Sequence, residues 1–468
     1  MVSKKLLKEK AKKISIIEGS SYAFSEGFGL RNVSAYALAL NSPNYIISLL
    51  TSIPSLLGNL SQFLSYRILL KTTRKKAVSI LVFLQALSWL MFIIPGVLFL
   101  RNKDFFLISW IILIIVYSLV IIFGSISGPI WTSWMKDIVK KKEFGRYFSY
   151  RNKIVLIFIV FSSIIAGLLL DFFKKFNMLL IGFFILFFLS FIARVISAYF
   201  FTKKYEPKYI LKKQENFTFG QFINNMAYNN FGSFVIFLSL VNFFVAIASP
   251  FFVVYLIKMK GLSYTLYSAS LFIMTISSIL TMSFWGKISD RSGNMKIIKL
   301  TLIGIIIIPL FYFFSNYIEN KILFIFIIFM TEAISGFCWG GFNLASFNFI
   351  LKIVSKQKIV YCTTYLNVVN GITIFFGAIF GGLLASMNNF FIDPILFVFL
   401  ISFLGRAITY IFILPKIKEE KGFFSYDNKL ILNLINIPKS FLNQSEQNYN
   451  LFNLIGKLKN HFNKSKTF

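Results

Sequence analysis

The stretch that decides how this chain folds reads WGKISDRSGNMK and covers residues 285–296. It is a short charged turn between two long apolar runs. We expect Gly286 to allow close helix packing and Gly293 to adopt the positive φ of a tight reversal, because glycine has no side chain to clash. The stretch also carries charge where a chain leaving a bilayer would meet water, at Asp290, Arg291 and Lys296.

The composition is that of a protein with many membrane spans. Of the 468 residues, 57% are hydrophobic and only 14% are charged, whereas about a quarter are charged in a soluble domain. The formal net charge of +32 comes from Lys and Arg placed between apolar runs, which membrane topology produces, so no nucleic acid is expected as a partner.

Redox and metal chemistry are not expected. Cys338 and Cys362 lack a Cys-x-x-Cys spacing, which argues against a disulfide framework and a zinc site, and His461 is the only histidine. We therefore expect no cofactor and no metal. The lysine-rich N-terminus lacks a compact apolar core and a small-residue cleavage site, so no removable signal peptide is expected.

Segments of about 20 mostly apolar residues are long enough to cross a bilayer. By this rule the sequence contains twelve spans, at residues 16–40, 44–66, 77–99, 105–134, 153–172, 177–201, 231–257, 263–286, 297–315, 322–351, 359–386 and 392–415. The first is the least hydrophobic. The predicted organisation is a basic N-terminal tail (1–15), a six-helix half (16–201), a linker (202–230), a second six-helix half (231–415) and a basic C-terminal tail (416–468). That last tail fits an amphipathic helix on the inner leaflet and a solvated segment equally well.

The distribution of positive charge predicts the topology. If both termini are cytoplasmic, the cytoplasmic segments hold 39 of the 49 Lys and Arg residues and the outside loops hold 7. The bias recurs at every loop, as the positive-inside rule requires. We therefore expect a multi-pass protein of the cytoplasmic (plasma) membrane with both termini in the cytoplasm.

The two halves share a weak internal repeat. Residues 190–196 (SFIARVI) correspond to residues 402–408 (SFLGRAI), so that Arg194 matches Arg406. Gly167 matches Gly381 at nearly the same offset. A duplicated six-helix unit accounts for both matches. Chance matching of apolar helices remains the alternative.

The spacing G-x-I-x-D-R-x-G-x-x-K in residues 286–296 resembles the loop signature of the major facilitator superfamily of secondary transporters. In that family the signature lies between spans 2 and 3 and recurs weakly between spans 8 and 9. Here the order is reversed, because Tyr66, Leu70 and Thr73 replace the Gly, Asp and second Gly of the first loop. The resemblance implies an all-α membrane protein of twelve helices in two pseudo-symmetric six-helix halves.

The resemblance also implies a gating role for this loop. In the family the loop aspartate latches the two halves on the cytoplasmic side by facing a helix N-terminus, which favours a carboxylate. Carried over, Asp290 is expected to face the start of span 5 near Arg146 and Arg151, with Asp137 in the same charge cluster. A solvated turn that only sets topology is the alternative. Trp131 and Trp134, just before Asp137, are interpreted as interfacial anchors.

Ionisable groups within spans are candidates for substrate binding or proton coupling. Glu26 and Glu332 each lie ten residues into a span, about 15 Å deep, close to the midplane of a ~30 Å core. Arg31 and Asn242 lie at similar depth on spans that line the cavity in the family. A structural Glu26–Arg31 pair is the alternative, although five residues place the two about 140° apart on a regular helix.

Three other charged residues receive structural interpretations. Glu18 lies at the cytoplasmic edge of the first span and is interpreted as an N-terminal helix residue. Arg194 and Arg406 lie in spans that are peripheral in the family. We interpret them as snorkelling side chains or structural hydrogen-bond donors, with ligand contact as the alternative.

The leading hypothesis is a secondary carrier that moves a small solute by alternating access. Proton coupling is one form of it, because a carboxylate in a low dielectric can exchange protons. Facilitated diffusion without coupling and an anionic substrate bound at Arg31 are alternatives to proton coupling. The expected partners are the lipid bilayer, an unidentified small-molecule substrate and protons, and a monomer is expected. A lipid scramblase or sensor on the same fold is one alternative. A membrane enzyme is another, but it would need clustered His, Asp, Glu or Cys that this sequence lacks.

The gating hypothesis predicts that Asp290→Asn weakens the outward-open state, because the neutral amide loses the attraction between a carboxylate and a helix N-terminus. Cysteine accessibility measured from both sides of the membrane reports the shift. Unchanged accessibility on both sides would contradict the latch.

Overall fold

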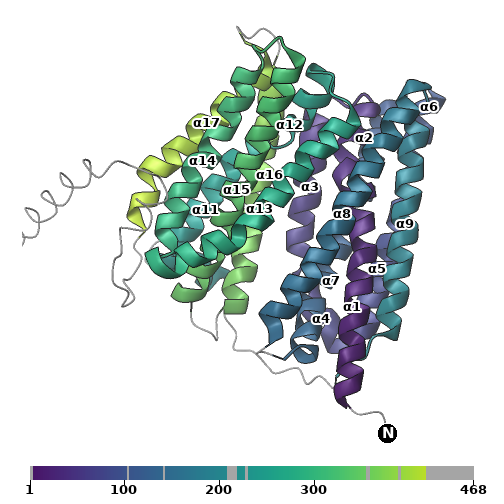
Figure 1. The fold of residues 1–468 in the computed structure, drawn as a ribbon, viewed down its shortest axis with the longest axis vertical. Helices are drawn as coiled ribbons and strands as arrows, with labels where there is room; N and C mark the ends of the chain where they lie inside the picture. The colour runs from purple at the N-terminus through teal and green to yellow at the C-terminus, as the bar shows by residue number, and fades with distance from the viewer. Residues whose placement is uncertain are drawn as a thin grey trace, which may run out of the picture.

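A computed structural model describes residues 4–102, 105–140, 143–207, 219–226, 230–354, 359–387 and 392–417. These residues form a bundle of long helices, and the described part of the chain contains no strand (Figure 1). The all-α class is confirmed, as expected for apolar segments that must satisfy their backbone groups internally in lipid. The predicted C-terminal tail beyond residue 417 and residues 208–218 and 227–229 of the predicted linker lie outside the described residues.

The N-terminal half comprises α1 (Lys4–Phe28), a 3-10 turn (Leu30–Asn32), α2 (Val33–Ala39), α3 (Asn44–Ser61), α4 (Phe63–Lys71), α5 (Arg74–Met91), α6 (Ile93–Arg101), α7 (Phe106–Ile138), α8 (Phe144–Lys175) and α9 (Leu179–Lys203). A short α10 (Phe219–Met226) follows. The C-terminal half comprises α11 (Asn230–Ala248), α12 (Phe251–Val253), a π-helical turn (Val254–Met259), α13 (Tyr264–Ser292), α14 (Asn294–Ser315), α15 (Lys321–Ile353), α16 (Ile359–Ala385), α17 (Pro394–Phe412) and a 3-10 turn (Leu414–Lys416).

The described chain has ten helices that are long and apolar enough to cross a membrane, or eleven if the bent pair α3–α4 is one span. The expected first span corresponds to α1, the 3-10 turn and α2, whose lysines and glutamates keep it outside that count. This arrangement is consistent with twelve spans. Large apolar side chains such as Ile115, Leu168 and Phe376 cover the outside of the bundle, where lipid would surround them.

The bundle has two ends that differ in how the halves meet. We call the end where α1 begins the N-terminal face and the other end the opposite face. At the opposite face one hydrophobic core joins both halves and includes Tyr36, Phe183, Tyr264 and Phe399. Toward the N-terminal face the core divides into one cluster for each half. The ribbons accordingly converge at the top of Figure 1 and diverge at the bottom, where the N-terminus lies.

Glycines allow the closest helix approach between α13 and α15. A Cβ atom added to Gly336 would overlap the carbonyl oxygen of Met274. A Cβ atom added to Gly340 would lie 2.6 Å from the carbonyl oxygen of Ser278. The prediction that Gly286 allows close helix packing is wrong, because a Cβ atom added there would meet only a Leu344 methyl group, at 3.8 Å. The backbones of the two helices approach most closely two to three turns earlier on α13. Beside Gly286 the Trp285 indole lies between them and donates a 2.9 Å hydrogen bond to the Phe337 carbonyl oxygen of α15.

We expect Gly336→Ala to lower stability by about 1–3 kcal/mol, because an overpacked site must shift its surroundings. The midpoint of thermal unfolding of the purified protein in detergent measures this effect. Gly286→Ala on the facing helix is the matched control and should leave the midpoint unchanged or higher, since alanine favours a helix. Equal midpoints for the two variants would contradict the assigned packing.

Candidate functional site

Glu332 of α15 is buried inside the C-terminal half, with 8% of its surface exposed. The hydroxyl of Tyr312 on α14 donates a hydrogen bond to its carboxylate. Within the described residues, no Lys or Arg forms an ion pair with Glu332. Tyr267 of α13, also buried, lies within electrostatic reach of both Glu332 and Arg31. A buried carboxyl group without a cation is held most easily as the neutral acid.

Glu26 and Arg31 form an ion pair, with 3.6 Å between the Glu26 Oε1 and Arg31 Nη2 atoms. The angular argument against this pair is wrong, because the helix does not continue regularly between the two residues. It ends at Phe28 and re-forms as a 3-10 turn from Leu30. Arg31 also donates hydrogen bonds of 3.2 and 3.3 Å to the Thr275 hydroxyl on α13, and so links the two halves.

Asn242 lies apart from this network. It is half-buried on α11, and its side chain has no hydrogen-bond partner in the part of the chain that the structure describes. Of the four residues predicted for the midplane site, the structure therefore joins Glu26 to Arg31 directly. Glu332 is linked to them only through the environment of Tyr267.

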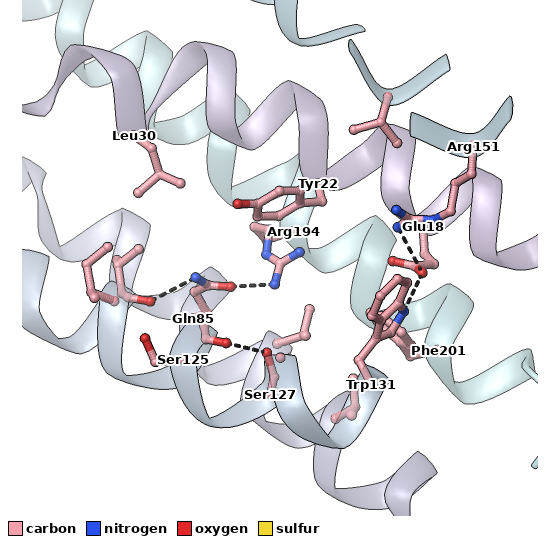
Figure 2. A pocket seen from close by; sticks show the side chains of 17 residues that line it. Glu18, Tyr22, Leu30, Gln85, Ser125, Ser127, Trp131, Arg151, Arg194 and Phe201 are labelled. Carbon is pink, nitrogen blue, oxygen red and sulfur yellow. Dashed lines mark hydrogen bonds and ion pairs between the residues drawn. The ribbon is translucent and has the colours of Figure 1, made fainter. Parts of the chain in front are cut away.

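A cavity of about 440 Å³ lies inside the N-terminal half (Figure 2). Residues of α1, α5, α7, α8 and α9 line it, and α1 and α7 form facing walls. Most of the lining is apolar. The polar groups are concentrated in two clusters, one around Arg194 and one around Glu18.

The first cluster holds Arg194 of α9, which is 4% exposed. It donates to the Gln85 side chain on α5 and, at 3.3 Å, to the Ser197 hydroxyl. The Tyr22 ring covers its guanidinium at 5.0 Å. Snorkelling is wrong for this residue, and the hydrogen-bond interpretation is confirmed. Its repeat partner Arg406 is also buried.

Arg406 uses the same kind of contact in the second half. It donates a 2.8 Å hydrogen bond to the Ile305 carbonyl oxygen. Ile305 lies on α14, the third long helix of its half, and Gln85 lies on α5, the third long helix of the other half. The two arginines therefore occupy matching places in the halves.

The second cluster centres on Glu18 of α1, which is 3% exposed. Its carboxylate accepts a 3.0 Å hydrogen bond from the Trp131 indole and lies 3.5 Å from Arg151 Nη2 and 3.6 Å from Lys204 Nζ. Burial lowers the pKa of Lys204 to about 8, and the Glu18 carboxylate opposes this fall. Glu18 therefore connects three other helices or their ends, beyond the role of an N-terminal helix residue.

The interpretation of the two tryptophans as interfacial anchors is wrong. Trp134 is fully buried and donates a 3.1 Å hydrogen bond to the Tyr205 carbonyl oxygen. Trp131 faces the cavity and Glu18. The ring of Trp134 also lies 4.9 Å from Lys204 Nζ. Both indoles face the bundle because each N–H finds an acceptor there.

The signature stretch lies on the N-terminal face, where residues up to Ser292 form the end of α13, Gly293 makes the turn and Asn294 begins α14. Gly293 has a φ of 84°, so the predicted positive φ is confirmed. Arg291 and Lys296 are exposed. The side chain of Asp290 lies outside the described part of the structure, and its latch stays a prediction.

The other two residues of the predicted gating cluster do not meet. Asp137 pairs with the buried Arg74 at 2.6 Å, whereas Arg146 is exposed. Arg74 also contacts Glu206, with 3.4 Å between its Nε and the carboxylate. The first-half loop, where the family signature is degraded, thus anchors α5 to the ends of α7 and α9 through Arg74.

A carboxylate latch does join the halves, on the opposite face. Asp171 of α8 accepts hydrogen bonds from the backbone N–H groups of Tyr264 (2.8 Å) and Thr265 (2.9 Å), and from the Thr265 hydroxyl (2.6 Å). These groups form the N-terminus of α13 in the other half. Nearby, Gly167 lets the two backbones touch, because an added Cβ would lie 2.7 Å from Thr265 Cα.

A second latch lies at the other helix pair that joins the halves on this face. Asn44, at the start of α3, donates a 2.7 Å hydrogen bond to the Ala385 carbonyl oxygen at the end of α16. Ser48, one turn further along α3, donates to the Ala378 carbonyl oxygen. Each of the two helix pairs that join the halves on this face, α8–α13 and α3–α16, is therefore held together at a helix end by hydrogen bonds of a polar side chain.

Sequence reasoning assigned no functional role to Glu18, Arg194 or Asp171. For Glu18 a signal existed, since it is one of few acids in a lysine-rich segment. Arg194 was visible as a charge within a span. Asp171 ends an apolar run and resembles an ordinary loop acid, so only the fold shows that it caps a distant helix.

Comparison with known proteins agrees with this architecture. The sequence profile of the Major Facilitator Superfamily matches residues 21–378. The nucleoside transporter NupG has 16% identity and a TM-score of 0.64, and the match covers 88% of this chain and 100% of that one. A bacterial homologue of the iron transporter ferroportin matches at a TM-score of 0.68 in its inward-facing state (11% identity, 88% of this chain and 99% of that one). In its outward-facing state with soaked iron the score is 0.54 (12% identity, 87% and 99%).

No match is found among curated proteins. The matched profile covers well over half of the chain, and its fold neighbours are transporters and not enzymes. The chain therefore belongs to the Major Facilitator Superfamily.

Proposed function

We propose that this protein is a secondary transporter that moves a small solute across the plasma membrane by alternating access. One observation carries the proposal: the halves share a hydrophobic core at the opposite face and have separate cores at the N-terminal face. Two bundles closed at one end and parted at the other are one of the two states that alternating access requires. The higher TM-score to the inward-facing ferroportin homologue supports this assignment.

The positive-inside bias of the loops supports placing the N-terminal face in the cytoplasm. The structure then corresponds to an inward-open state that the two opposite-face latches keep closed to the outside. The contacts that close this face are the shared hydrophobic core, hydrogen bonds and small-residue packing, all of which can separate and re-form without unfolding either half. The Arg31–Thr275 contact would also have to be made and broken in the cycle.

Glu332 is the group that we propose for proton coupling. It is buried, it has a neutral hydrogen-bond partner, and it lies on a helix that lines the central cavity in this family. Protonation and deprotonation therefore change the charge of the C-terminal half where no cation compensates it. Glu26 already has a cation partner, so it is the weaker candidate.

Asp171→Ala should shift the protein away from the inward-open state, because it removes three hydrogen bonds to the N-terminus of α13. Losing a helix cap costs about 0.5–2 kcal/mol, so the population ratio should change roughly 2- to 30-fold. Pulsed electron–electron resonance between spin labels at the exposed positions 136 and 287 measures the opening of the N-terminal face.

Asp393→Ala is the matched control for this experiment. Asp393 also caps a helix, accepting a 2.8 Å hydrogen bond from Ile395 N, but that helix, α17, is in the same half. Its loss should lower stability without changing the distance distribution. Equal distributions in wild type and Asp171→Ala would contradict the latch.

Glu332→Gln should remove the effect of a pH gradient on transport, because glutamine is neutral at every pH. A solute that stabilises the purified protein in a thermal screen is first identified and then followed in proteoliposomes. Uptake by wild type should respond to an imposed pH gradient, and uptake by Glu332→Gln should not. Glu319→Gln, at an exposed loop carboxylate, should behave as wild type.

Wild-type uptake that ignores the pH gradient would contradict proton coupling but not transport. Movement of labelled lipid without flux of any water-soluble solute would instead indicate a scramblase on the same fold.

A further inference from the structure

The cavity in the N-terminal half carries an excess of positive charge. Arg151 and Arg194 line it, and Glu18 is the only carboxylate in its lining. That carboxylate is already shared between Arg151 and Lys204, at 3.5 and 3.6 Å. The next acid along α1, Glu26, pairs with a different arginine. The described lining therefore holds two arginines and one carboxylate, and that carboxylate also neutralises part of the charge of Lys204.

Arg194 forms no ion pair within the described residues, although Glu18 lies within electrostatic reach of it. Its two terminal nitrogens donate to the neutral side chains of Gln85 and Ser197. Its Nε atom is buried and has no hydrogen-bond partner in the described structure. A buried charge without a counter-ion is costly, so an anion that entered the cavity would gain a strong interaction there. In Figure 2 the guanidinium lies between Tyr22 and Gln85 at the cavity wall.

The cavity has room for such a ligand. Its volume of about 440 Å³ is within the range of small-molecule sites. A Cβ added at Gly128 would meet no atom within 4 Å, so this part of α7 borders open space. The hydroxyl of Ser125 and the ring of Tyr22 offer polar and flat contacts on opposite walls, and Val82 and Val120 offer apolar ones.

We infer that this cavity binds a small organic anion, with its carboxylate or phosphate group at Arg194 and its body between α1 and α7. The inference rests on the proposed transport function and names the substrate class. The oxyanion would accept hydrogen bonds from the guanidinium, which suits planar oxyanions well. Arg151 adds a second positive charge to the cavity lining, beside Glu18.

Arg406 separates this role from a purely structural one. It is equally buried and lies in the matching place of the other half, but it donates to the Ile305 carbonyl oxygen. If buried arginines only fasten the outer helices of each half, changes at Arg194 and Arg406 should have the same consequences. If Arg194 binds the anion, only its replacement should change ligand binding.

The test measures binding by the purified full-length protein in nanodiscs, using isothermal titration. Glucose 6-phosphate and glucuronate are compared with glucose, and phenyl phosphate and benzoate with benzyl alcohol. At least one anion should bind wild type clearly better than its neutral counterpart. The phosphate and carboxylate arms show which oxyanion is preferred.

Arg194→Gln should weaken that binding about tenfold or more, the usual effect of losing a charge-assisted hydrogen bond. Arg194→Lys should retain part of it, and Arg406→Gln should bind as wild type. Gly128→Leu should abolish binding by filling the cavity, whereas Gly128→Ala should not. If Arg194→Gln does not fold, comparing Gly128→Leu with Gly128→Ala still tests whether the anion binds in this cavity.

Two results would overturn the inference: no anion binding better than its neutral counterpart, or anion binding that survives both Arg194→Gln and Gly128→Leu. Failure of the proposed function would look different. Anion binding without flux of any solute would contradict the transport function but support the anion site. Flux of a neutral solute without anion binding would contradict the anion site but support the transport function.

Discussion

Each charge inside this bundle must find its partner inside the bundle, because surrounding hydrocarbon offers none. This constraint explains why Arg194 reaches Gln85, why Arg406 reaches a backbone carbonyl, and why Glu18 collects two cations and an indole N–H. The same constraint makes unpaired groups informative. Within the described residues Glu332 has only the Tyr312 hydroxyl as a partner, which is why it is the group proposed for proton coupling.

Much of the architecture follows from the sequence because hydropathy and charge bias act over whole segments. The long apolar runs predicted the membrane-spanning helices. The glycine at position 293, between two such runs, predicted the positive φ that the structure shows there. The first span was recognised as the least hydrophobic. The structure shows a broken helix there, and its charged residues Glu18, Glu26 and Arg31 all have partners within the bundle.

The site was less predictable, because side-chain partners depend on helix rotation and on local breaks. A regular helix would have separated Glu26 from Arg31, but the break at Gly29 brings them together. From the sequence, Trp131 and Trp134 were interpreted as lipid anchors. In the structure, the orientation of α7 about its axis directs both indoles toward the bundle. Asp171 could not be assigned at all, because its partner on α13 is over ninety residues away in the sequence.

The backbone contact at Gly167 gives the molecule a mechanical property. Where α8 meets α13 at Gly167 and Thr265, no side chain separates the two backbones. This contact would therefore serve as the pivot for a rotation of one helix against the other in the proposed transport cycle. From that point α8 extends to Phe144 at the N-terminal face, a lever arm of about 35 Å at 1.5 Å per residue. A roll of roughly 10° would move the far end by about 6 Å over that length. In the proposed transport cycle, a small adjustment beside Asp171 would therefore produce a much larger displacement at the N-terminal face.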